Sequence, residues 1–518
     1  MPQAVPRPVA RASAATLPMQ GLRAILLPAV VTSGLWLLRA NEVRLGGVAC
    51  SFSLALLTAV SYFAWRERGS ASDTPLLALV CAMIWVSFSF PLFWGSETVI
   101  GASGTRYLSQ ESVGAAMVAA VVASAAMCAG YMLRLSRGPQ PQEIFIFKSN
   151  TNSHAYLWCL LLGALLASPS IDSLVHRSGD LFKQPIKVAI QFAPLVAFAL
   201  LVLDYQRKRG TYLDKIGLPL YFSGRTAVGL ASGWLGSVVG IGVVTVMAYC
   251  MKWRRLPLIP IALIFLVVLF LQPGKQGFRD RYWYVADSAT VAERVADWTS
   301  ESARLWGDAI SGQGGAEWKQ LGRESIGRLD ILHQTANVFE YTPRVVPYQY
   351  GRLYSYLLYT WIPRFAWPSK PSMNDANRWY QVAYGLTNDE NLEGVSISCG
   401  FIAEAYISFG WLGVVLIPFG IGVFLDYLER MLLSRSSGIY FNAVGLALIP
   451  QLISIEAQLG QYLAGIVQMI ALTTVVLLPV LVWRRKAERR AFAAAARVAA
   501  IQRGRVASPA GAGPLSPA

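Results

Sequence analysis

Long runs of apolar residues constrain the fold of this chain of 518 residues more than any other feature of its sequence. The runs are about 17–25 residues long, the length that an α-helix needs to cross a bilayer hydrocarbon core of roughly 30 Å. They are continuous rather than alternating, which excludes the strands of a porin-type barrel. Only 14% of the residues are charged, against about 25% in soluble chains, which excludes a soluble enzyme or a disordered chain. We therefore expect an all-α polytopic membrane protein.

The apolar runs predict about 12 transmembrane helices. The long runs are 22–38, 46–65, 75–94, 113–133, 155–171, 186–203, 226–251, 256–272, 402–427, 438–456 and 461–483. One further run, 211–224, is short and carries Asp214 and Lys215 near its start. Its glycine and proline residues are typical of the broken helices that lie beside polar cavities in membrane proteins.

The basic residues favour counting this short run as a span. The formal net charge is +16, and the excess of Lys and Arg lies in short loops and in the C-terminal tail. With twelve crossings most of these basic residues fall on one side of the membrane, as the positive-inside rule requires of the cytoplasmic side. With eleven crossings the difference in basic residues between the two sides becomes smaller. Both termini are therefore expected in the cytoplasm.

This orientation divides the chain into a cytoplasmic N-terminus (1–21), nine spans (22–272), a large outward helical loop (273–401), three spans (402–483) and a basic cytoplasmic tail (484–518). The large loop contains nearly equal numbers of basic and acidic residues, so the positive charge of the chain does not indicate a nucleic-acid partner. The six cysteines form neither a disulfide framework nor a CxxC pair. No metal site and no cofactor are expected.

The large loop is rich in Tyr, Trp and Arg between residues 348 and 380. One interpretation is an aromatic belt at the membrane interface, with arginine side chains that extend toward water. The other is a site for sugars and phosphate, because pyranose faces stack on aromatic rings and guanidinium groups bind phosphate with two hydrogen bonds. The segment 362–371 (IPRFAWPSKP) favours this second interpretation, since its three prolines fix the backbone around Arg364 and Lys370.

Two residues are candidate acid–base groups. Glu404 lies at the start of an apolar helix, and a carboxylate in a membrane span is costly enough to suggest a function. The alternative is that Glu404 only pairs with an arginine in the structure. His333 is the single histidine of the large loop; it could act as a base that titrates near neutrality, or it could be structural.

Several motifs of the second half resemble bacterial Wzy-type polymerases, which join oligosaccharide repeat units in O-antigen and exopolysaccharide assembly. The matching pieces are Ser223-Gly224-Arg225, Gly322-Arg323 with Arg328, Tyr341-Thr342-Pro343, Tyr350-Gly351, the IPR…WPSKP segment 362–371, and the segment 400–410 (GFIAEAYISFG). They lie within residues 223–427, and the first 200 residues match only as apolar spans. The family also shows an Arg-x10-Gly spacing, which Arg225 and Gly236 satisfy and the large loop does not repeat.

The resemblance implies a helical GT-C-like fold and glycosyl transfer at the outer face of the bacterial inner membrane. An undecaprenyl-diphosphate-linked glycan would be the donor and a lipid-linked repeat unit the acceptor, with a separate chain-length-determining co-polymerase as a possible partner. The departing diphosphate needs nearby positive charge. The candidate diphosphate-binding residues are Arg225, Arg323, Arg328, Arg352, Arg364, Lys370 and Arg378. The candidate general bases are Glu404 and, after it, His333.

Two other functions stay open beside the polymerase. An O-antigen ligase has the same chemistry and differs only in its acceptor. A transporter or flippase of lipid-linked glycans would distribute charged residues through its spans, whereas here they concentrate in one outer loop.

Overall fold

The computed structural model of the chain is mostly helical. The helices that are long and apolar enough to cross a membrane are Leu45–Arg66, Leu76–Trp94, Gln110–Met132, Phe182–Gln206, Gly400–Leu432 and Leu459–Val480. Ile259–Leu271 and Lys275–Tyr282, bent by 60°, add another if they form one broken span. Three apolar helices are shorter: Pro28–Leu37, Val238–Trp253 and Gly438–Leu452. The chain is therefore a mostly helical protein with several helices that can cross a membrane.

The structure describes most of the chain between residues 28 and 484. The described residues are 28–37, 44–67, 74–94, 98–133, 143–168, 171, 174–175, 178–233, 235–283, 289–312, 321–322, 325, 327, 329–359, 362, 366–367, 369–372, 374–392, 397–463 and 465–484. The predicted cytoplasmic N-terminus (1–21) and nearly all of the predicted tail (484–518) lie outside them.

The first part of the chain forms a bundle of apolar helices with two strand pairings. Its elements are α2 (Leu45–Glu67), α3 (Leu76–Trp94), β1 (Thr98–Gly101), β2 (Gly104–Tyr107), α4 (Gln110–Met132), β3 (Phe145–Phe147), α5 (Thr151–Ala167), α7 (Gly179–Lys187), η3 (Val188–Phe192), α8 (Ala193–Gln206), α9 (Tyr212–Ala231), α10 (Leu235–Trp253) and α11 (Leu258–Leu271). Strand β1 pairs with β2, and β3 pairs with β4 from the end of the chain, both antiparallel.

The second part contains the predicted outer loop and the last apolar helices. Its elements are α12 (Lys275–Tyr282), α13 (Val291–Ser311), α15 (Leu332–Tyr341), η5 (Arg352–Tyr354), α16 (Tyr356–Tyr359), α17 (Asp375–Ala383), η6 (Asp389–Asn391), α18 (Gly400–Leu432), η7 (Arg435–Ser437), α19 (Gly438–Leu452), α20 (Leu459–Leu463), α21 (Ile466–Leu477), η8 (Leu478–Val480) and β4 (Leu481–Trp483).

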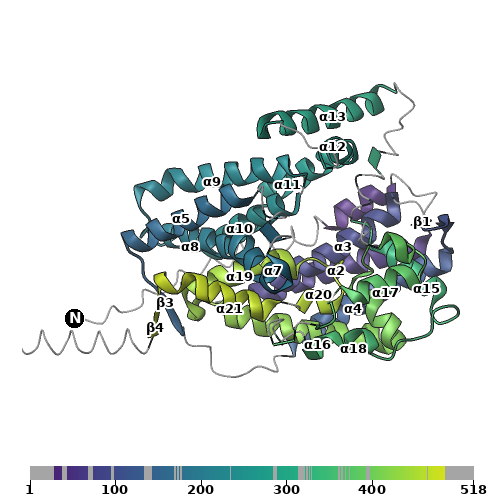
Figure 1. Cartoon of the computed structure of the whole chain (residues 1–518). Coiled ribbons are helices and arrows are strands. Elements are labelled where there is room, and N and C mark those ends of the chain that lie inside the picture. Colours follow the sequence, from purple (N-terminus) through teal and green to yellow (C-terminus); the bar gives the residue numbers. More distant parts are fainter. Residues whose placement is uncertain are drawn as a thin grey trace, which may run out of the picture.

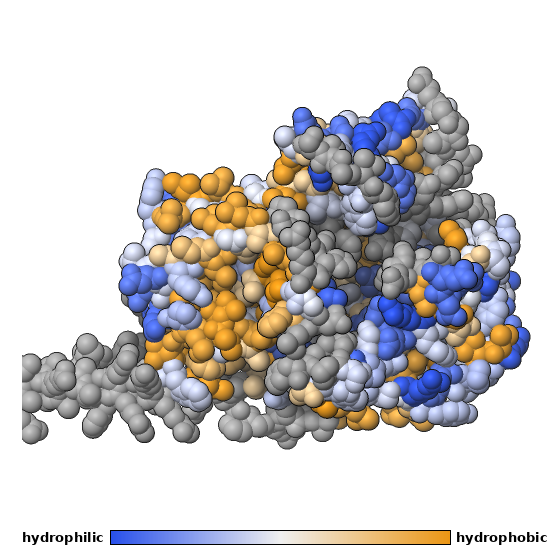
Figure 2. Space-filling model, viewed as in Figure 1, coloured by the Kyte–Doolittle hydropathy of each residue, from blue (hydrophilic) through white to orange (hydrophobic). Residues whose placement is uncertain are grey.

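The elements of the predicted outer loop divide between two places in the molecule. Helices α15 and α17 and strand β1 lie at the right in Figure 1, at the end of the bundle away from β3 and β4, and α16 lies at the bottom of the view beside α18. Helices α12 and α13 lie above α9 and α11. Hydrophobic residues dominate the visible surface at the left, and hydrophilic residues gather over α13 and over the region of α15 and α17 (Figure 2). We call α15, η5, α16 and α17 the outer layer.

The closest contact between long helices joins α4 and α18. A Cβ atom at Gly422 would overlap the carbonyl oxygen of Met127, and one at Gly130 would overlap the carbonyl oxygen of Phe419. The two backbones therefore touch directly, which only glycine permits. Small residues at such crossings are how helices pack closely within lipid.

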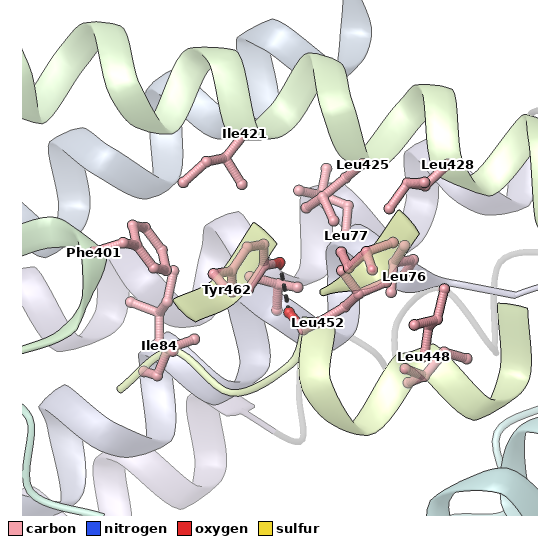
Figure 3. Close-up of a cluster of buried hydrophobic side chains, with 14 of the residues drawn as sticks. Leu76, Leu77, Ile84, Phe401, Ile421, Leu425, Leu428, Leu448, Leu452 and Tyr462 are labelled. Atoms are coloured by element: carbon pink, nitrogen blue, oxygen red, sulfur yellow. Dashed lines mark hydrogen bonds between the residues drawn. The ribbon is translucent and has the colours of Figure 1, made fainter. Parts of the chain in front are cut away.

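The main hydrophobic core surrounds this contact. Figure 3 shows Leu76 and Leu77 of α3 facing Leu425 and Leu428 of α18, with side chains of α19 and α20 completing the cluster. The Tyr462 hydroxyl donates to the carbonyl oxygen of Leu452 (2.6 Å) and so ties α20 to the end of α19. Residues from the first, middle and last parts of the chain thus share one core.

Helix α18 is broken at Phe409 and Gly410, whereas the sequence predicted one continuous span over 402–427. Phe409 and Gly410 depart from helical geometry, and Gly410 has φ 61° and ψ −147°. A glycine suits this position because side chains disfavour positive φ. Residues 400–408 therefore form a separate short helix, and this helix carries Glu404.

The structure corrects two of the predicted spans. The run 211–224 is longer than predicted, because α9 continues through Ser223, Gly224 and Arg225 to Ala231, and the turn lies at Ser232 and Gly233. Arg225 therefore lies inside a helix and not between two apolar runs. The last predicted span, 461–483, ends in strand β4, because this segment supplies the pairing partner of β3.

The α4–α18 contact predicts the effect of adding one methyl group. Gly422→Ala should lower the free energy of unfolding by about 1–3 kcal/mol, because overpacking forces the two backbones apart. Thermal unfolding of the purified protein in detergent measures this. Gly420→Ala is the matched control, since a Cβ there meets no atom within 4 Å. Equal melting temperatures for the two variants would contradict the contact.

Candidate functional site

Glu404 lies at the centre of the polar residues that the outer layer buries. Its side chain is fully buried, with 0% exposure. One carboxylate oxygen, Oε2, accepts a hydrogen bond from the backbone N–H of Leu459 (2.6 Å) at the start of α20. The other oxygen, Oε1, has no hydrogen-bond partner among the described residues. Glu404 therefore pairs with no arginine among the described residues.

Three polar side chains surround Glu404. The Gln458 side-chain amide donates to the Cys399 thiol (3.5 Å), and Cys399 precedes the first residue of α18. Burial, with the nearby Glu404 carboxylate as a lesser cause, raises the pKa of Tyr354 well above its ordinary value. The Tyr354 hydroxyl has no hydrogen-bond partner in the described part of the chain. Element η5, which carries Tyr354, packs against α18 and α20.

A second polar group joins α15 to α17. The Tyr380 hydroxyl donates to Gln334 (3.1 Å), and the hydroxyls of Tyr384 and Thr342 lie 2.5 Å apart. Burial raises the pKa of both tyrosines. Asn337 is fully buried with neither amide atom paired within the described ranges, which is uncommon because buried polar atoms are normally hydrogen-bonded.

The structure fixes His333 through a carboxylate. Its Nδ1 lies 2.6 Å from Oδ2 of Asp330, and its backbone N–H donates to Oδ1 of the same residue (3.0 Å). Because an ionised carboxylate only accepts, the Nδ1–H of His333 donates to Asp330, and this contact fixes the orientation of the ring. The side chain is 3% exposed, so His333 is oriented as a base would be but is buried.

The predicted diphosphate-binding cations fall into three groups. Arg352 and Arg378 are exposed on the outer layer, and neither forms an ion pair with a described residue. Lys370 is buried, and its Nζ donates to the carbonyl oxygen of Ile362 (2.9 Å). Arg225 donates to the Ser168 hydroxyl (2.6 Å). The remaining candidates, Arg323, Arg328 and Arg364, lie outside the described residues.

These residues are only partly brought together. Arg352 lies on η5, which packs against α18, the helix that carries Glu404, and Arg378 lies on α17. Arg225 belongs to α9, which packs mainly on α10, α13 and α8. We therefore treat the outer layer and the start of α18, with Arg352, Arg378, Glu404 and His333, as the candidate site. The described residues hold no group of three His, Cys, Asp or Glu side chains arranged for a metal ion.

Two residues that the sequence interpretation did not select hold this site on the bundle. Arg106 of β2 donates to the carbonyl oxygens of Tyr384 (3.0 Å) and Gly385 (3.3 Å) at the end of α17. Glu340 of α15 accepts from the hydroxyls of Ser109 and Ser112 at the start of α4, both at 2.5 Å. These hydrogen bonds lower the pKa of Glu340. Neither role could be found from sequence spacing, because each partner lies more than 200 residues away.

A buried charged network near β3 was also missed. The two ring nitrogens of His154 lie 2.8 Å from Asp214 Oδ2 and 3.1 Å from Asp204 Oδ2. Trp158 donates to the other Asp214 oxygen (2.8 Å), and Ser149 donates to Asp204 (2.5 Å). All three ionisable side chains are at most 5% exposed.

This network joins three helices. Both ring nitrogens of His154, on α5, face carboxylate oxygens of α8 and α9. Asp214 also accepts from the backbone N–H of Thr211 (2.6 Å) at the start of α9. The network therefore ties α5, α8 and α9 together at one end of the bundle.

Removing Asp214 should be strongly destabilising. Asp214→Ala leaves the Nδ1 atom of His154, the Trp158 side chain and the backbone N–H of Thr211 without an acceptor, and we expect a loss of about 3–5 kcal/mol in unfolding free energy. Thermal unfolding in detergent measures the loss. Asp389→Ala removes an exposed carboxylate and should change stability by less than about 0.5 kcal/mol. Similar losses in both variants would argue against the network.

Comparison with known proteins places most of these elements in one family. A family model described as "Domain of unknown function (DUF8712)" matches residues 101–453. The match begins at the end of β1 and ends just after α19, so it includes α4, the outer layer and α18. No curated protein and no solved structure matches the chain. Because the matched residues make up more than half of the sequence, the chain belongs to the DUF8712 family.

Proposed function

We propose that the chain is a membrane glycosyltransferase that polymerises lipid-linked oligosaccharide repeat units at the outer face of the bacterial inner membrane. The proposal includes about 12 spans, a GT-C-like arrangement and cytoplasmic termini. The donor is a glycan on undecaprenyl diphosphate, and the acceptor is a single lipid-linked repeat unit. The motif resemblance described above motivates this assignment, and the outer layer supplies its physical support.

One observation carries the proposal: the outer layer and its adjoining loops present exposed cationic side chains and exposed aromatic rings. Arg352 and Arg378 are exposed and form no ion pair with a described residue. Tyr359 lies edge-on to Trp367, with ring centroids 5.7 Å apart, and Tyr350 is 80% exposed. Unpaired guanidinium groups bind phosphate well, and exposed aromatic faces stack on sugars.

The proposed reaction needs charge stabilisation more than any other contribution. A hydroxyl at the non-reducing end of the acceptor attacks the anomeric carbon of the donor, a new C–O bond forms, and the bond to the lipid diphosphate breaks. The hydroxyl proton passes to a base, and the electron pair leaves with the diphosphate. Arg352 and Arg378 are the proposed partners of the departing diphosphate, because they add positive charge where negative charge develops.

Glu404 and His333 remain the proposed bases for the hydroxyl proton. Glu404 has one carboxylate oxygen without a hydrogen-bond partner among the described residues, and Asp330 orients the ring of His333. Both side chains are buried in this structure. Substrate would reach either of them only after the outer layer shifts, and catalytic hydrogen bonds often form only in the substrate complex.

Arg352→Ala should lower polymer formation by about 100-fold, the usual effect of removing one group that stabilises developing negative charge. The measurement is elongation of lipid-linked repeat units by the purified protein in vesicles. Arg304→Ala is the matched control, because Arg304 is exposed but pairs with Glu301 and Asp308 on α13. Equal activity in the two variants would remove Arg352 from the site.

Glu404→Gln separates a chemical role of this residue from a structural one. The amide oxygen of glutamine can still accept from the N–H of Leu459, so the melting temperature should stay near that of the native chain. Loss of the base should lower elongation by about 100-fold or more. Native elongation with a native melting temperature would leave Glu404 with a structural role alone.

Surface polysaccharide in a deletion strain of the source bacterium distinguishes the three functions. A polymerase predicts surface glycan capped at one repeat unit, restored to full length by the native chain and not by Arg352→Ala. Lipid-linked repeat units stranded on the cytoplasmic face would instead identify a flippase. Full-length polymer that stays on its lipid carrier would identify a ligase.

A further inference from the structure

A cavity of about 470 Å³ lies between the starts of α2 and α4 and the end of α3. Charged side chains, Arg44 and Glu111, line it at the starts of α2 and α4. Apolar side chains, among them Leu92 and Met117, line the rest, together with Cys50. The cavity is therefore amphipathic, with a charged mouth and an apolar interior. We call it the α2–α4 groove.

The dimensions of the groove match the upper part of a membrane lipid. Its lining on α4 runs from Gln110 to Val118, which is about 12 Å along the helix axis at a rise of 1.5 Å per residue. Both α2 and α4 are long and apolar enough to cross a membrane, so the groove begins at one end of two spans. A lipid held there would place its head group at the mouth and its first methylene groups inside.

Glycines keep this space open. A Cβ atom at Gly46 or at Gly114 would meet no atom within 4 Å. Both residues line the groove, so larger side chains at these positions would occupy it without touching a neighbour. Close helix packing therefore does not require glycine at position 46 of α2 or at position 114 of α4. It does require glycine at position 130 of α4.

The charges at the mouth select the head group. Arg44 is positive and Glu111 is negative, and neither forms an ion pair with any residue in the described ranges. A head group that carries both a phosphate and a primary ammonium group can satisfy both side chains, with Arg44 on the phosphate and Glu111 accepting from the ammonium. A lipid with only negative charge would face repulsion from Glu111.

We propose that the α2–α4 groove binds one phospholipid with a primary ammonium head group, such as phosphatidylethanolamine. This lipid is distinct from the polyprenyl diphosphate of the proposed reaction, because a diphosphate has no positive group to place against Glu111. The bound lipid stabilises the start of α4, where Ser109 and Ser112 hold Glu340 and hence the outer layer. The site does not depend on the proposed function being correct.

Cys50 provides a readout inside the groove. It is a half-buried free thiol, Cys159 is exposed, and Cys81, Cys128, Cys250 and Cys399 are buried. The Cys159→Ser variant of the full chain therefore leaves Cys50 as the accessible thiol. Purified protein is placed in nanodiscs of phosphatidylcholine, alone or mixed with phosphatidylethanolamine or phosphatidylglycerol. The rate of Cys50 alkylation by N-ethylmaleimide is then followed by mass spectrometry.

Phosphatidylethanolamine should slow alkylation of Cys50 several-fold, and phosphatidylglycerol should not. Glu111→Gln should abolish the difference between these two lipids, whereas Glu390→Gln, which changes an exposed acid elsewhere, should preserve it. Equal rates in all three lipid mixtures would overturn the proposal. Stronger protection by phosphatidylglycerol or by an added polyprenyl diphosphate would overturn it too, because it would show that the groove prefers an anionic lipid.

A second variant tests whether the groove itself is the site. Gly114→Leu fills the groove and should slow alkylation equally in every lipid. Gly163→Leu is its control, because Gly163 is an exposed helical glycine of α5 with no atom within 4 Å of its Cβ position, and it should keep the response to phosphatidylethanolamine. A lipid response that survives in Gly114→Leu would place the bound lipid elsewhere and overturn the assignment.

Discussion

The direct backbone contact between α4 and α18 is the interaction on which the rest of the structure depends. Gly130 and Gly422 allow it, and such close packing is what holds helices together in lipid, where apolar burial contributes little. The starts of both helices also support the outer layer. Glu340 binds at the start of α4, and η5 and α20 pack against α18. A displacement of α4 along α18 would therefore move both supports of the candidate site.

Buried polar groups occur in two clusters that differ in how completely they are paired. In the cluster near β3, each ring nitrogen of His154 and both carboxylate oxygens of Asp214 have partners. Such a saturated network stiffens the helices that it joins. In the outer layer, Glu404 Oε1, the Tyr354 hydroxyl and both amide atoms of Asn337 have no partner among the described residues. A polar ligand would gain most from the second cluster, because unpaired buried groups are costly until they are satisfied.

The sequence predicted the features that depend on local pattern and missed those that depend on distant partners. Continuous apolar runs correctly predicted α2, α3, α4 and α8, since each of these helices is apolar around its whole circumference. The same reasoning divided α9 wrongly between the runs 211–224 and 226–251, because Arg225 interrupts the apolar residues there. The polar residues at the start of α9 belong to a capping box, in which Thr211 and Asp214 satisfy the first N–H groups of the helix. The second role of Asp214, as a partner of His154, depends on a residue 60 positions earlier.

The candidate site shows the same division. Glu404 could be selected from sequence, because a carboxylate inside an apolar helix is costly wherever that helix lies. Its contact with Leu459 could not, since it depends on how the last helices fold back. The candidate cations also cannot be told apart from sequence, where Lys370 and Arg352 are both basic residues of one aromatic-rich segment. In the fold, the Lys370 ammonium donates to a backbone carbonyl, whereas Arg352 is exposed. Only a group that is not already bound inside the protein is available for the diphosphate of the proposed reaction, so the fold, and not the charge, ranks the candidates.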